Sequence, residues 1–329
     1  MKSDVEADLE ALRAGAAWVD RSAFHLRRFV GAGRVSFLHK YCTQEVRRAP
    51  GEGAYGCVLT VKGGLLGDLT VYLREDDLLA LCPEAAAEGI YRHLGKYALF
   101  DDVRMEDLSA EWAVRGLWGP GARELLAAFF AEEPPAVPYA HRTHVRSEGA
   151  VVLARNDAFG LIGWDLIGPR EVVAACEEAL CAAGARRVGP EAVNVVRVEE
   201  GVPLYGVDLD AKTLPLEAGL VEKAVSYEKG CYLGQEVVAR ATHRGRVNRH
   251  LRGVVLEAAV EVPAPVRAEG EEKELGRITS AARSPRRGGA PVGMGLLHRK
   301  VAAEGTRVRV GPEEVPGVVC SLPFAPPEA

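Results

Sequence analysis

The stretch Lys229-Gly230-Cys231-Tyr232-Leu233-Gly234-Gln235-Glu236 holds more special residues than a periodic core requires. Two glycines bracket a Cys-Tyr pair, and glycine permits a positive φ or a close backbone approach. A lysine ammonium close to a thiol lowers its pKa, so Lys229 would make Cys231 a better nucleophile or metal ligand than a buried cysteine. The alternative is a turn with a structural cysteine, because no base lies near the thiol in the sequence. The residues alone leave both interpretations open.

Length and composition predict a soluble chain of two or three domains. At 329 residues and 48% hydrophobic, the chain exceeds one ordinary core. Its apolar runs are too short to span a membrane, and its acidic first ten residues are unlike a secretory signal. Seven cysteines without a C-x-x-C pair fit a reducing cytosol, and the net charge of −5 does not favour nucleic-acid binding. We therefore expect a cytoplasmic protein with no membrane or nucleic-acid partner and no metal site.

The first third predicts a mixed α+β domain with antiparallel hairpins. Two β-rich runs, 54–61 and 65–73, flank Lys62-Gly63-Gly64 and indicate a hairpin. Asp68 lies inside the second run, where an unpaired buried carboxylate is costly. It needs a partner or a function, unless it marks a solvated strand end. A helix from Pro83 to Leu94 and a strand over 97–106 should follow, and the absence of a G-x-G-x-x-G or Walker loop gives no sign of a nucleotide cofactor.

A pattern of apolar strand, Gly-Pro turn and helix occurs twice, over 113–126 and 161–173. Two such copies suggest two related α+β lobes, separated by the proline-rich segment 132–138. In the second helix Cys176 shares a face with Val172 and Leu180, which predicts a core position.

The last third is basic at its start and β-rich afterwards. Residues 240–252 contain five arginines and two histidines without an acid. This run is either a solvated face or the mouth of an anion site, since arginine recognises carboxylates bidentately. From Leu251 onward, short strands punctuated by glycine and proline predict a small β-barrel or sandwich.

The octapeptide resembles the signature of the YgfZ family of folate-binding proteins. These proteins are relatives of the glycine cleavage T-protein, an aminomethyltransferase, and of mitochondrial iron–sulfur assembly factors. Segments 197–208, with the pattern R-x-E-x-G-x-x-x-Y-G-x-D, 215–220 and 276–285 resemble the same superfamily. The resemblance covers nearly the whole chain and implies an α+β, three-domain T-protein-like ring. It implies two related α+β lobes within 1–245, divided near 110–140, and a C-terminal β-barrel over 246–329.

The resemblance also implies a site for tetrahydrofolate or a one-carbon-substituted folate. The position matching the family's pterin carboxylate is Glu199, and one carboxylate can accept the pterin's two parallel donors. The T-protein hairpin pattern G-G-x-x-D-D-L appears here as Gly63-Gly64-Leu65-Leu66-Gly67-Asp68-Leu69, which keeps only the second aspartate. Asp68 would then lie near the reacting folate nitrogen and steady a cation or move a proton. The predicted catalytic residues are Asp68 and Cys231, and the predicted cofactor-binding residues are Glu199, Tyr205, Lys229, Tyr232, Gln235 and Arg240.

The octapeptide is absent from aminomethyltransferases, so the resemblance favours the YgfZ branch. It implies a tetrahydrofolate-binding protein acting in iron–sulfur cluster assembly or repair, with iron–sulfur client or assembly proteins as partners. One cysteine offers one ligand, so no stable cluster is expected on a monomer. The alternatives are a folate-dependent aminomethyltransferase or other one-carbon transferase in which Asp68 and Glu199 suffice, and a scaffold that senses folate without chemistry.

Overall fold

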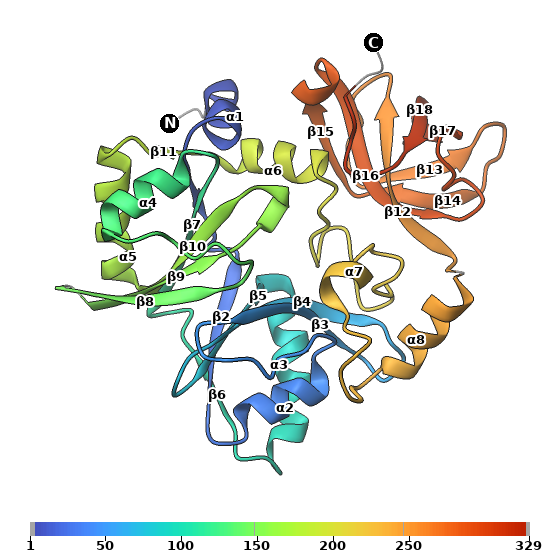
Figure 1. The fold of residues 1–329 in the computed structure, drawn as a ribbon. Coiled ribbons are helices and arrows are strands. Elements are labelled where there is room, and N and C mark those ends of the chain that lie inside the picture. Colours follow the sequence, from blue (N-terminus) through green and yellow to red (C-terminus); the bar gives the residue numbers. More distant parts are fainter. Residues whose placement is uncertain (1–3, 148, 246, 327–329) are drawn as a thin grey trace. The chain divides into compact units, whose positions relative to one another are not determined.

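The structure is a computed structural model that describes residues 4–147, 149–245 and 247–326. The chain forms two compact units (Figure 1). Unit 1 is built from the residues up to Leu59, from Leu66–Val193 and from Ala224–Leu233. Unit 2 is built from Thr60–Leu65, Asn194–Lys223 and the residues from Gly234 onward. The octapeptide thus contributes to both units.

The first lobe of unit 1 is a five-stranded sheet in the order β3-β4-β5-β2-β6. Its strands are β2 (Phe24–Val30), β3 (Gly53–Leu59), β4 (Leu65–Leu73), β5 (Leu78–Pro83) and β6 (Arg104–Asp107), and its helices are α2 (Arg34–Tyr41) and α3 (Glu84–Ala98). The predicted strand 65–73 coincides with β4. The strand predicted over 97–106 begins too early, because α3 continues to Ala98 and the strand found there is β6, Arg104–Asp107. Tyr97 stacks on Tyr41 of α2 at 4.7 Å between ring centroids, and this contact favours the extra helical turn.

The second lobe of unit 1 is a six-stranded sheet in the order β11-β1-β7-β10-β9-β8. Its strands are β1 (Ala17–Asp20), β7 (Trp112–Trp118), β8 (His141–Arg146), β9 (Gly149–Arg155), β10 (Gly163–Pro169) and β11 (Arg186–Arg187), with helices α1 (Val5–Arg13), α4 (Ala122–Phe130) and α5 (Arg170–Ala182). Strands β7 and β10, which carry the two Gly-Pro copies, pair antiparallel in this one sheet. Assigning the copies to two lobes is therefore wrong, and the first lobe lacks the pattern.

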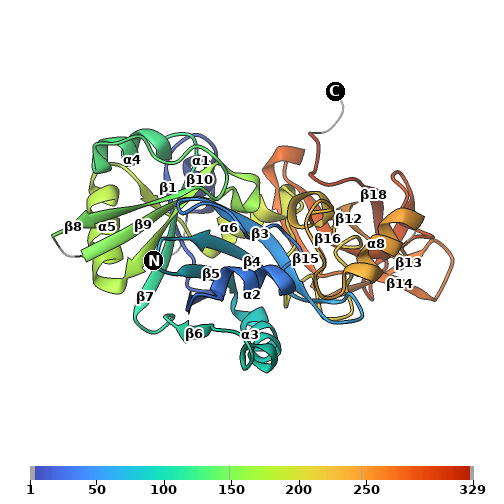
Figure 2. The same cartoon turned by 60° about the horizontal axis from the view of Figure 1, so that its bottom comes forward.

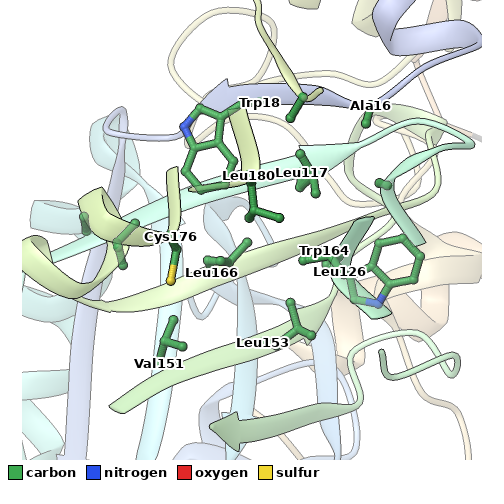
Figure 3. Close-up of a cluster of buried hydrophobic side chains, with 14 of the residues drawn as sticks. Ala16, Trp18, Leu117, Leu126, Val151, Leu153, Trp164, Leu166, Cys176 and Leu180 are labelled. Atoms are coloured by element: carbon green, nitrogen blue, oxygen red, sulfur yellow. The ribbon is translucent and has the colours of Figure 1, made fainter. Parts of the chain in front are cut away.

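Both faces of the second sheet are buried, because its strands alternate between two apolar environments. Leu166 belongs to the cluster on the side of α4 and α5, whereas its neighbour Ile167 belongs to the cluster shared with the first sheet. Val151 and Val152 divide in the same way. Figure 3 shows Cys176 of α5 within the helix-side cluster. The predicted core position of Cys176 is confirmed.

Unit 2 contains a closed β-barrel, which decides between the predicted barrel and sandwich. Its strands are β12 (Arg249–Leu256), β13 (Ala264–Ala268), β14 (Glu274–Ile278), β15 (Ser280–Ser284), β16 (Ala290–His298), β17 (Arg307–Val310) and β18 (Val315–Cys320). The order β12-β18-β17-β13-β14-β16 closes through a pairing of β12 with β16, and β15 adds to β16. Figure 2 labels β12, β13, β14, β15, β16 and β18 of this barrel. Strand β13 was not predicted, because Pro265 interrupts its apolar run.

The segment 197–208 is anchored to the barrel by a buried polar network. Arg197, on α6 (Pro190–Glu199), donates to the carboxylate of Asp208 at 2.7 Å, and both side chains are buried. The hydroxyls of Thr279 and Ser280 also donate to Asp208, each at 2.6 Å. This explains why the pattern carries an arginine and an aspartate eleven positions apart. The predicted α+β class, with two lobes and a barrel, is confirmed, whereas the ring arrangement and the domain limits stay predictions.

Candidate functional site

Asp68 lies on the face of β4 that turns toward the second lobe. Side chains alternate along a strand, so Asp68 shares its face with Tyr72, which is buried in the cluster between the two sheets. The opposite face of β4 packs on α3, where a Cβ on Gly67 would stand 2.4 Å from Cβ of Ala86. Gly67 also has φ +154°, a backbone conformation that is strained for any residue with a side chain. The family's first aspartate is thus missing at a position where the structure has no room for it.

The carboxylate of Asp68 is half-buried and accepts a hydrogen bond from the hydroxyl of Tyr55, at 3.0 Å. Burial raises the pKa of Asp68, although the bond from Tyr55 and the charge of Arg21 act in the opposite direction. The ring of Tyr55 stacks on Tyr139 of the second lobe, with centroids 6.2 Å apart and planes 17° from parallel. The result is a proton-exchanging carboxyl beside an aromatic surface.

A second buried carboxylate, Asp165, faces the first lobe from β10. It accepts from Arg21 at 2.5 Å and from the amide of Asn156 at 2.6 Å, both at one oxygen. The guanidinium of Arg21 lies 4.0 Å from the ring centroid of Phe24. This network holds the end of β1 against β10. The positive charge of Arg21 also acts to lower the pKa of Asp68.

Sequence reasoning missed Tyr55, Tyr139, Arg21 and Asp165. Asp165 carried the same signal as Asp68, an acid inside an apolar strand. The two tyrosines carried no signal, because their contacts join segments that are far apart in the sequence.

Lys229 caps the C-terminal end of α2. Its buried ammonium donates to the carbonyls of His39 and Cys42, each at 2.6 Å, and of Gln44 at 3.1 Å. These bonds satisfy carbonyls that the end of a helix leaves without partners. Burial lowers the pKa of Lys229 to about 8. The structure thus directs the ammonium to backbone oxygens, and a role for Lys229 in binding a cofactor stays a prediction.

Cys231 is exposed, while the side chains of Lys229 and Tyr232 in the same loop are buried. The ammonium of Lys229 lies 5.2 Å from the ring centroid of Tyr232, whose pKa burial raises to about 12. The amide of Leu233 donates to the carbonyl of Lys40 at 3.1 Å, which ties the far side of the loop to α2. Among the seven cysteines, Cys231 is the exposed one; four are buried and two are intermediate. The loop therefore presents this thiol on a fixed backbone.

Glu199 is fully buried at the end of α6 in unit 2. Its carboxylate accepts from the hydroxyl of Ser284 at 2.6 Å and from the amide of Arg286 at 3.1 Å. The guanidinium of Arg286 lies 3.9 Å away and also pairs with Glu200. These contacts connect α6 to the barrel. A pterin could reach this carboxylate only after the contacts rearrange, so the pterin role of Glu199 stays a prediction.

The other predicted binding residues also lie in unit 2. Tyr205 is half-buried, and burial raises its pKa. Gln235 is the first residue of α8 (Gln235–Arg244), after Gly234 in the left-handed conformation. Arg240 is exposed and pairs with Glu236 one helical turn away. Arg246 of the basic run lies outside the described residues, and the binding roles of these residues stay predictions.

Within unit 1 the structure brings the octapeptide loop and Asp68 to the same lobe. The loop contacts α2 through Lys229 and Leu233, and Asp68 lies on β4 of the same lobe. The predicted binding residues Glu199, Tyr205, Gln235 and Arg240 belong to unit 2. A single cavity that joins the two sets stays a prediction.

Two features of the described residues bear on the kind of site. Across 4–147, 149–245 and 247–326, no group of three or more His, Cys, Asp or Glu side chains is placed to hold a metal ion. None of the helices in these ranges is long and apolar enough to cross a membrane.

Two α+β lobes followed by a closed six-stranded barrel, with an acid in the first hairpin, define a T-protein-like class of protein. The GCVT N-terminal domain family matches residues 1–229, and the glycine cleavage T-protein C-terminal barrel domain matches residues 249–325. The chain belongs to the family of the GCVT N-terminal domain.

Relatives resemble the chain over nearly its full length. An aminomethyltransferase of Rubrobacter xylanophilus is 30% identical over 326 residues, which cover 97% of this chain and 86% of the relative. An aminomethyltransferase of Geobacillus kaustophilus is 30% identical over 319 residues, covering 94% and 86%. The crystal structure of glycine cleavage system aminomethyltransferase T from Bartonella henselae superposes with a TM-score of 0.85 at 22% identity, covering 98% of this chain and 89% of that one. This last likeness concerns the fold.

Proposed function

We propose that the chain is a tetrahydrofolate-binding protein that supports the assembly or repair of iron–sulfur clusters in client enzymes. The observation that carries this proposal is the presentation of Cys231. A loop held through Lys229 and Leu233 exposes one thiol, while the side chains of Lys229 and Tyr232 are buried. A fixed exposed thiol is suited to contact a partner protein. Because it supplies one ligand, a cluster would need further ligands from the partner.

The folate part of the proposal rests on unit 1. Asp68 offers a carboxyl with a raised pKa, and the stacked pair of Tyr55 and Tyr139 offers an aromatic surface that fits a pteridine. A bound reduced folate would supply the nitrogens that carry a one-carbon unit. Asp68 would hold or move a proton beside them, and Tyr55 would orient Asp68 through its hydrogen bond. Glu199 is fully buried, so it fits a role beside the folate nitrogens less well than the half-buried Asp68 does.

A second candidate function is one-carbon transfer of the aminomethyltransferase type. The names of relatives at 30% identity favour it, as does the retention of Asp68 in the hairpin. In this case Asp68 would be the catalytic residue, and Cys231 would have no role in the reaction.

A Cys231→Ser variant separates the two functions. We expect tetrahydrofolate affinity, measured by calorimetry, to be unchanged, because serine preserves the loop. In cells that lack the wild-type protein, the variant should fail to support iron–sulfur client enzymes. Cys181→Ser, at a half-buried cysteine, is the matched control and should support them. Full client activity with Cys231→Ser would refute the thiol role, and turnover of methylene-tetrahydrofolate with an aminomethyl donor would then favour the transferase.

A further inference from the structure

A pocket of about 300 Å³ opens on the barrel of unit 2, and Arg249 of the basic run 240–252 is one of its lining residues. It lies where the start of β12 meets the end of β16, since Arg249 and His298 are paired directly across these strands. The turn before β14 completes its wall. The lining residues are Arg249, Lys273, Glu274, Leu275, Gly276, His298 and Lys300.

The charges around this pocket are unequally compensated. Arg249 donates to the carboxylate of Glu217 at 2.8 Å, and Glu274 accepts from Arg277 at 2.6 Å. Lys273 and Lys300 are exposed, and neither has an ion-pair partner in the part of the chain that the structure describes. Two positive charges therefore remain at the pocket of a chain whose net charge is −5. A local positive field in a concave site attracts anions.

His298 adds a hydrogen-bond donor to these cations. The amide of Lys300 donates to Nδ1 of His298 at 3.3 Å. A neutral imidazole whose Nδ1 accepts carries its hydrogen on Nε2. The ring can therefore donate a hydrogen bond to an anion in the pocket.

We propose that this pocket binds a phosphate-bearing small molecule. The uncompensated cations are lysines, which bind phosphate as point charges, whereas the bidentate fork of Arg249 already holds Glu217. A carboxylate ligand would compete with Glu217 for that fork. A phosphate needs no fork, and the two ammonium groups with the imidazole N–H match its several acceptor oxygens.

The test uses inorganic pyrophosphate as the probe and the whole chain in low-salt buffer at pH 7. Calorimetry should show saturable binding, and the Cε1–H resonance of His298 should shift with the same affinity. A Lys273→Ala/Lys300→Ala variant should bind at least tenfold more weakly. The charge-matched control, Arg283→Ala/Arg307→Ala, removes two exposed arginines of the same barrel and should bind as the wild type does.

Four results would overturn the proposal. The first is that pyrophosphate does not bind to the wild type at millimolar concentration, and the second is that the control variant loses as much affinity as the lysine variant. Equal affinity for citrate would show a general anion site without preference for phosphate. Thermal unfolding of both variants checks that they are folded. The fourth result is an unmoved His298 resonance in saturated wild type, which would place the ligand elsewhere.

Discussion

A hydrogen bond holds the carboxyl of Asp68 in position, although burial makes the ionised form of this carboxyl unfavourable. The Tyr55 hydroxyl orients it, while partial burial penalises its ionised form and raises its pKa. A carboxyl in this state exchanges a proton closer to neutral pH than an exposed aspartate does. This is the property that a general acid or base requires.

We expect Asp68→Asn to lower one-carbon turnover, where present, by about 10²–10⁴-fold, the usual contribution of a general acid or base. The variant should be no less stable than wild type at pH 7. The folded state of wild type holds its proton above the ordinary pKa of 3.8, so wild type loses stability relative to the variant as pH rises from 3.8 through the raised value. Urea unfolding from pH 3.5 to 8 measures this difference. A difference that shrinks with rising pH would contradict the assignment.

Lys229 has the opposite dependence on pH. We expect Lys229→Met to cost about 2–4 kcal/mol, because the end of α2 loses three hydrogen bonds to carbonyls. The folded-state pKa of about 8 lies below the ordinary 10.5, so wild type should gain stability relative to the variant as pH rises from about 8 to 10.5. Denaturant titrations across that range give the values. Lys40→Met, at an exposed lysine of the same lobe, should show neither effect.

Among the elements, the contact of β4 with α3 sets where Asp68 stands. We expect Gly67→Ala to destabilise unit 1 by about 2–4 kcal/mol, because its Cβ would overlap Ala86 at a positive φ. The matched substitution is Gly95→Ala in α3, whose Cβ would meet no atom within 4 Å. It should stay within about 1 kcal/mol of wild type, on the stabilising side. Thermal unfolding compares them, and a harmless Gly67→Ala would show that β4 and α3 can separate without cost.

The elements also show what local sequence can and cannot predict. The β-rich run 65–73 predicted the limits of β4, and a charge inside that run identified Asp68. The repeated strand-turn-helix pattern misassigned the Gly-Pro copies, because such a unit does not encode which sheet its strand joins. Tyr55 and Tyr139 could not be predicted, since their stacking depends on how two lobes pack. The partners of Lys229 lie up to 190 positions earlier in the chain, beyond any local pattern.

At the scale of the whole molecule, Glu199 links α6 to the barrel of unit 2. We expect Glu199→Gln to cost unit 2 about 1.5–3 kcal/mol, since the bonds from Ser284 and Arg286 would reach a neutral oxygen and the guanidinium of Arg286 would face an amide in place of a carboxylate. Hydrogen exchange should report the loss in β12–β18 and leave β7–β10 protected. Glu200→Gln, at the half-buried neighbour, is the control.

The same variants test the pterin role of Glu199. If Glu199 contacts the pterin, tetrahydrofolate affinity of folded Glu199→Gln should fall by about 1.5–3 kcal/mol, while Glu200→Gln binds normally. Unchanged affinity together with a destabilised barrel would assign Glu199 to the fold alone.

The cap on α2 has a consequence for synthesis on the ribosome. The carbonyls of His39, in the last turn of this helix, and of Cys42 and Gln44, just after it, share Lys229 as their donor. A nascent chain that has produced the whole first lobe still lacks this donor until most of the protein has emerged. The lobe therefore reaches its final form late in translation, and a transcript truncated before codon 229 would yield a polypeptide with an incomplete lobe and no thiol loop to display.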